Sequence, residues 1–201
     1  MSFIVSIETL RHLGSIVNVA KFIFATKNVI EEIGSNEFNA ALHSLDDMSR
    51  SNNPERELNM AITQLRSALE HFKSKSLGIL GSVSADKQMF QTALLISICY
   101  KFLQETILSY KYRDISIKAF STWLEAYSHC PSGKLYWREL YYDRVKDEVN
   151  KLGLNWPYSY PPSGFFDVFS DKHSRKFNSA LTEHKEKIKE QYLLFVTRII
   201  N

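Results

Sequence analysis

Residues that interrupt helices are scarce over most of this chain. The 201-residue sequence contains 7 glycines and 5 prolines, and three of the prolines lie between residues 157 and 162. Glycine and proline disfavour helix most strongly, so the long stretches without them favour helix over sheet. With 44% hydrophobic and 23% charged residues, the composition is typical of a globular protein. We therefore expect an all-α, single-domain bundle of about six or seven helices over residues 1–201, with a possible subdivision into 1–130 and 131–201.

The N-terminal segment, residues 1–33, is the most hydrophobic part of the chain. Glu8 and Arg11 interrupt the apolar run that a signal peptide would need. The longest stretch without a charged residue or histidine is the eight residues 13–20, well below the roughly 18–20 that span a bilayer. We expect a helix buried in the bundle. The alternative is a membrane-surface-active effector that inserts residues 1–33 into a membrane surface or a partner.

Two amphipathic helices are predicted next. Gly34 and Ser35 resemble a helix stop followed by a new N-cap, which predicts a helix over residues 36–49. Asn53 followed by Pro54 predicts the start of another helix, which runs to Lys75. Its apolar residues recur at the helical period and form the clearest such pattern in the chain: Leu58, Ala61, Ile62, Leu65, Ala68, Leu69 and Phe72.

The remaining helices are predicted over residues 86–111, 115–129, 134–152 and 171–199. The first of these is apolar nearly all round, so we expect it to be central and the most buried. The last carries His184 on its apolar stripe, which indicates a core or boundary histidine. Its other side has Lys and Glu at spacings of three and four residues, typical of a solvated face.

An irregular segment, residues 153–169, precedes the last helix. It combines three prolines and two glycines with six aromatic residues, a composition that excludes regular helix. One interpretation is an ordered loop packed over the bundle. The other is a partner-binding surface, because tyrosine and tryptophan combine a large contact area with a polar group. The candidate partner-binding residues are Trp156, Tyr158, Tyr160, Phe165 and Phe166.

The stretch QLRSALEHF, residues 64–72, contains the sharpest catalytic candidate. Arg66 and His71 are separated by four residues, a spacing that resembles the Arg-x4-6-His signature of HEPN ribonucleases. The resemblance implies an all-helical, metal-independent ribonuclease in which Arg66 stabilises phosphate charge and His71 acts as acid or base. On one regular helix the two side chains are about 140° apart, so they would have to meet across a dimer. Arg66 also has an ordinary structural use, an ion pair with Glu70 one turn on.

Charge and cysteine content limit the other classes of function. The net charge of +3 is small, and nucleic-acid-binding proteins usually carry a strongly basic face, so we do not expect a nucleic-acid partner. Cys99 lies in an apolar run and should be a buried thiol. With Cys130 as the second cysteine, neither a disulfide framework nor a zinc motif is present. We expect a cytoplasmic protein without metal or cofactor.

The function that these features favour is non-enzymatic. We expect a cytoplasmic helical protein that binds or regulates another protein, through the aromatic segment or through a groove between helices, and that could form a homodimer. A HEPN-like ribonuclease using Arg66 and His71 and a membrane-surface effector are the alternatives.

Overall fold

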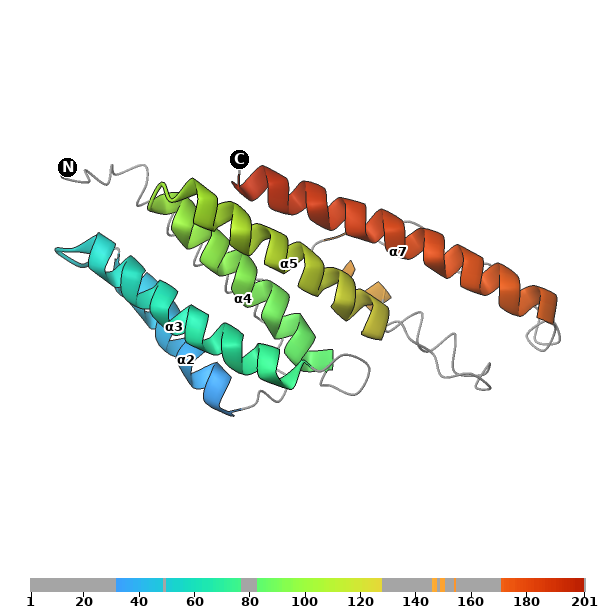
Figure 1. Cartoon of the computed structure of the whole chain (residues 1–201), viewed down its shortest axis with the longest axis horizontal. Helices are drawn as coiled ribbons and strands as arrows, with labels where there is room; N and C mark the ends of the chain where they lie inside the picture. The colour runs from blue at the N-terminus through green and yellow to red at the C-terminus, as the bar shows by residue number, and fades with distance from the viewer. Residues whose placement is uncertain are drawn as a thin grey trace.

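The computed structural model describes residues 32–48, 50–76, 83–127 and 171–200, together with residues 146, 147, 149, 150 and 154. The described part is an all-α bundle, as the sequence predicts, shown in Figure 1. Its five helices are α2 (Glu32–Met48), α3 (Pro54–Lys75), α4 (Val83–Phe102), α5 (Thr106–Tyr127) and α7 (Asp171–Ile200).

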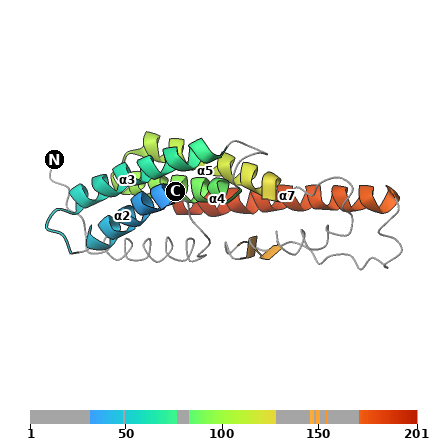
Figure 2. The ribbon, with the colours of Figure 1, turned by 90° about the horizontal axis from the view of Figure 1, so that it is seen from below.

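Two hairpins and one long helix make up the bundle. The α4–α5 hairpin lies in the middle, with the α2–α3 hairpin on one side and α7 on the other (Figure 1). Seen from below in Figure 2, the helices run along the long axis of the molecule, and α7 extends past the end of α5. One hydrophobic cluster joins the α2–α3 hairpin to α4 and α5, and a second joins α4 and α5 to α7. The middle hairpin therefore contributes to both cores.

Helix α3 follows the sequence prediction closely. All seven residues of its predicted apolar face are buried. The side chain of Asn53 accepts a hydrogen bond of 3.1 Å from the backbone amide of Arg56, and Pro54 occupies the first helical position. These are the capping interactions that the Asn-Pro pair predicts. The local sequence thus fixes both where α3 begins and which side it buries.

Helix α2 begins earlier than predicted. It runs without interruption from Glu32 to Met48, through Gly34 and Ser35, so the predicted helix stop and new N-cap at these residues were wrong. A glycine inside a helix costs only about 1 kcal/mol relative to alanine. Phe38, Ala41 and Leu45 pack against α3, and burial of that face outweighs the cost of one glycine.

The predicted central helix, residues 86–111, is divided in the structure. Helix α4 ends at Phe102 and the chain reverses before α5 begins at Thr106. At the reversal Gln104 has a φ of 59°. Its amide donates to the carbonyl of Lys101 (3.0 Å), and the amide of Glu105 donates to the carbonyl of Tyr100 (2.9 Å). This is the Schellman pattern, which glycine usually completes. Because glutamine stands there, the sequence contains no breaker to indicate the turn.

Replacing Gln104 by glycine should stabilise the protein. A left-handed conformation costs a non-glycine residue roughly 1–2 kcal/mol, and part of that gain is offset because glycine makes the unfolded chain more flexible. We expect the free energy of unfolding in urea to rise by about 0.5–1 kcal/mol. The matched control is Lys118→Gly at an exposed position within α5, which should lower it by about 1 kcal/mol. A loss of stability in Gln104→Gly would show that the reversal is not strained.

Buried polar side chains join α4 to α5 and α5 to α7. Ser97 and Ser109 each donate a hydrogen bond to the other's carbonyl, at 2.7 and 2.9 Å. Ser116 donates to the carbonyl of Phe90 at 2.7 Å, which leaves the hydroxyl of Tyr192 to donate to Ser116 at 2.7 Å. Burial raises the pKa of Tyr192. These bonds satisfy buried polar groups that would otherwise destabilise the fold.

Helix α7 matches its predicted range closely. His184 is buried among its apolar residues, as predicted, and burial lowers the pKa of its imidazole. On the solvent side, Lys185 and Lys189 reach across to Glu125 of α5 at 2.7 and 2.9 Å. Helix α7 therefore contacts α5 through buried apolar residues and, at the edge of that contact, through ion pairs.

Several predicted segments lie outside the described residues. These include residues 1–31, most of the predicted helix 134–152 and all of segment 153–169 except Leu154. Val149 and Leu154 are described, and both are buried in the second core. The predictions for the remaining residues of these segments stay predictions.

Candidate binding groove between helices α3 and α5

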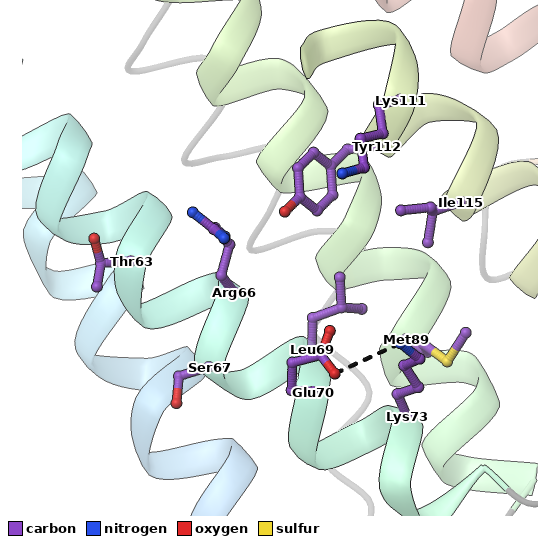
Figure 3. A pocket seen from close by; sticks show the side chains of 10 residues that line it. All are labelled: Thr63, Arg66, Ser67, Leu69, Glu70, Lys73, Met89, Lys111, Tyr112 and Ile115. Carbon is purple, nitrogen blue, oxygen red and sulfur yellow. Dashed lines mark ion pairs between the residues drawn. The ribbon is translucent and has the colours of Figure 1, made fainter.

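A groove of about 610 Å³ opens between α3 and the α4–α5 hairpin (Figure 3). Such a volume is within the range of about 300–1,000 Å³ that ligand clefts usually have. Its lining residues come from three helices. They are Thr63, Arg66, Ser67, Leu69, Glu70 and Lys73 from α3, Met89 from α4, and Lys111, Tyr112 and Ile115 from α5.

Apolar side chains form the inner surface of the groove. Leu69 belongs to the buried face of α3, and Met89 and Ile115 are half-buried hydrophobic residues packed against the same core. Met89 and Ile115 therefore combine a fixed position with a partly accessible surface, beside the buried Leu69. A ligand with an apolar group can bury it here without any rearrangement of the core.

Two cations are held at the tyrosine on the α5 side. In Figure 3 the side chain of Arg66 points toward the ring of Tyr112, and its positive charge acts to lower the pKa of the phenol. The Lys111 ammonium lies 6.0 Å from the centre of the same ring, at the limit for a cation–π contact. Tyr112 is buried and stacks on Tyr100 with ring centres 5.5 Å apart. The two charges are thus organised around one rigid aromatic residue.

The pKa of Tyr112 reflects these neighbours. Burial raises it above the ordinary value of 10.0, and the positive charge of Arg66 opposes that rise. Neutral tyrosine is therefore the form present at physiological pH, and its hydroxyl remains a hydrogen-bonding group. The ring and the hydroxyl present an apolar and a polar contact side by side.

Among the described residues that line the groove, one carboxylate lies beside the cations. Glu70 pairs with Lys73 at 3.6 Å (Figure 3), with both side chains well exposed. The sequence interpretation paired Glu70 with Arg66 instead, whereas in the structure Arg66 is directed to Tyr112. With Lys111 included, the described part of the lining has three cations and one carboxylate. The groove is therefore electropositive.

His71 lies on the other edge of α3. Its Nε2 is 3.5 Å from the Glu37 carboxylate of α2, and Ser67 donates a 2.7 Å hydrogen bond to the same carboxylate. Within one chain Arg66 and His71 thus have different partners on different helices, which agrees with the 140° separation expected on a helix. Their joint action in a ribonuclease would need a second copy of the chain, and it stays a prediction.

A shallower hollow of about 550 Å³ lies beside the groove on the outer side of α3. Thr63 lines both, so the two hollows adjoin at that residue. The other residues that line this hollow are Arg56, Asn59, Met60 and Gln64. Met60 is 40% exposed, one of the large hydrophobic side chains that the described surface leaves accessible. The accessible surface thus extends along much of α3.

Most groove residues could not be identified from the sequence alone. Lys111 and Ile115 are four residues apart, so the helical period alone predicts that they share a side of one helix. Nothing in the sequence placed that side against Arg66, because the chain reversal at Gln104 was not predicted. The candidate partner-binding residues Trp156, Tyr158, Tyr160, Phe165 and Phe166 lie outside the described residues, so their role stays a prediction.

Comparison with known protein families, with curated proteins and with solved structures found no match for this sequence. Among the described residues, no group of three or more His, Cys, Asp or Glu side chains could hold a metal ion. Every helix in that part of the chain is too short or too polar to cross a bilayer. The chemistry of the groove is the feature from which a function can be proposed.

Proposed function

We propose that this chain is a non-enzymatic interaction protein that binds a segment of another protein in the groove between α3 and α5. One observation supports the proposal: the same groove has an apolar inner surface and charged residues beside it. Protein-binding sites typically place apolar and aromatic anchors at the centre and polar groups at the rim. Leu69, Met89 and Ile115 would be the centre, and Arg66 and Lys111 the rim.

The position of the groove suits this role. Tyr112 and Leu69 are held by the core, so a partner would meet surfaces that are already ordered. Binding to ordered groups avoids part of the entropy cost of association. The charged side chains Arg66, Lys73 and Lys111 are exposed, so a partner can reach them.

Two further expectations belong to the proposal. The aromatic segment, residues 153–169, would supply a second contact surface through Trp156 and Tyr160. The compartment would be the cytoplasm, which suits the buried free thiol of Cys99. A homodimer would be compatible with either surface.

Site-specific photo-crosslinking tests the proposal. A benzoylphenylalanine placed at Thr63, which is exposed beside the groove, should form one discrete adduct with the partner in cells. The same group at Glu190, exposed on α7, is the matched control and should not form that adduct. Mass spectrometry should place the adduct on α3 and return the same partner peptide in repeated experiments. Equal adducts at both positions would contradict binding in the groove.

A further inference from the structure

We infer that the partner segment is a short acidic peptide with interspersed apolar residues. The inference rests on the proposed function and specifies its ligand. An apolar side chain of the peptide contacts Leu69, Met89 and Ile115, while its carboxylates lie beside Arg66 and Lys111. Arg66, Tyr112 and Lys111 together select for negative charge next to an apolar group.

Charge complementarity supports an acidic ligand. Of the described ionised side chains that line the groove, Arg66, Lys73 and Lys111 are cations and Glu70 is the carboxylate. The ion pair with Lys73 already occupies Glu70. Arg66 and Lys111, whose described contacts are to the neutral Tyr112, remain to pair with a ligand. Opposite charge across an interface raises both the association rate and the specificity.

The apolar inner surface argues for a peptide instead of a bare anion. Inorganic phosphate would contact Arg66 and Lys111 but would leave Met89 and Ile115 exposed to water. A peptide can fill both parts, because leucine-like side chains and carboxylates alternate along one chain. Burial of one such side chain removes apolar surface from water and so favours binding.

Glu70 argues against a dense polyanion such as RNA. Its exposed carboxylate lies within the groove, between the positions of Arg66 and Lys73 on α3. A nucleic-acid backbone carries a phosphate at every nucleotide and would bring one against Glu70. An acidic peptide can place a neutral side chain there.

Fluorescence anisotropy with the full chain tests the inference. The probe is a short fluorescein-labelled peptide in which leucines are separated by pairs of glutamates. One control peptide replaces each glutamate by lysine, and another replaces each leucine by serine. We expect the probe to bind more tightly than both controls, and its affinity to fall as salt rises, because salt screens exposed charges.

Variants of the groove connect that binding to named residues. Arg66→Gln and Lys111→Gln should each weaken binding of the probe about three- to fivefold, the range of an exposed ion pair. The double variant should lose about tenfold. Arg198→Gln, at an exposed position on α7, is the matched control and should leave the affinity unchanged. Circular dichroism and thermal unfolding check that each variant is folded.

Three outcomes would overturn the inference. The lysine peptide could bind more tightly than the probe, or Arg198→Gln could lose as much affinity for the probe as Arg66→Gln. A uridine oligonucleotide could also bind more tightly than the probe and depend on Arg66 for its binding. If the probe fails but the crosslink at Thr63 persists, the acidic ligand is wrong and the groove function stands. If the crosslink at Thr63 also fails, the proposed function is wrong as well.

Discussion

Replacing Phe120 by alanine should lower the free energy of unfolding by about 3–5 kcal/mol. Phe120 is 1% exposed and lies where α4, α5 and α7 meet. Its ring stacks on Tyr192 with centres 3.9 Å apart, and it meets the edge of Phe90 at 5.2 Å. Alanine removes these contacts and leaves a cavity that a close-packed core fills only in part. Urea unfolding followed by circular dichroism measures the loss.

The control for this variant lies on the same helix. Ile107 of α5 is 84% exposed, so Ile107→Ala should change the free energy of unfolding by less than about 0.5 kcal/mol. The expected contrast comes from burial, since both substitutions remove a large hydrophobic side chain from α5. Similar losses in the two variants would mean that the α4–α5–α7 core is not packed as described.

Raising the pH above about 9 should destabilise the fold through Cys99. Burial raises the pKa of its thiol from 9.0 to about 12. The stabilising effect of the buried thiol is fully present below about pH 9, where the thiol is protonated in both the folded and the unfolded protein. Between pH 9 and 12 the unfolded thiol ionises while the folded thiol keeps its proton. The free energy of unfolding should therefore fall by about 1.4 kcal/mol per pH unit.

Cys99→Ala isolates the contribution of this thiol. Every other ionisable group, Tyr192 with its raised pKa included, is shared by the two proteins. Urea unfolding at a series of pH values, with a reducing agent present, should give a steeper fall above pH 9 for the native chain than for Cys99→Ala. Parallel curves would show that Cys99 is not buried in the folded state.

Local patterns in the sequence predict much of the bundle. The period of the apolar residues in α3 identifies its buried face, because a regular helix repeats every 3.6 residues. Asn53 and Pro54 mark its beginning because their cap interactions are local. The buried states of Cys99 and His184 follow from the apolar residues around them. In each case the deciding interactions are made by residues close together in the sequence.

Features decided by distant contacts could not be predicted. The reversal at Gln104 uses a residue that disfavours the left-handed conformation, and it is stable because α5 packs back on α4. Gly34 remains helical because α2 packs on α3. The groove needs Arg66 of α3 beside Tyr112 of α5, and this proximity follows from the order of helices in the bundle. These features are set by tertiary packing, which overrides local propensity.

The yield of the crosslink from Thr63 can be compared between the native chain, Arg66→Gln and His71→Gln. This comparison tests most directly whether the partner binds in the groove between α3 and α5. Arg66 lies in that groove, whereas His71 contacts Glu37 on the other edge of α3. Below saturation, Arg66→Gln should reduce the yield of the adduct about three- to fivefold, and His71→Gln should leave it unchanged. An adduct whose yield is undiminished in Arg66→Gln, or falls equally in His71→Gln, would contradict binding in the groove.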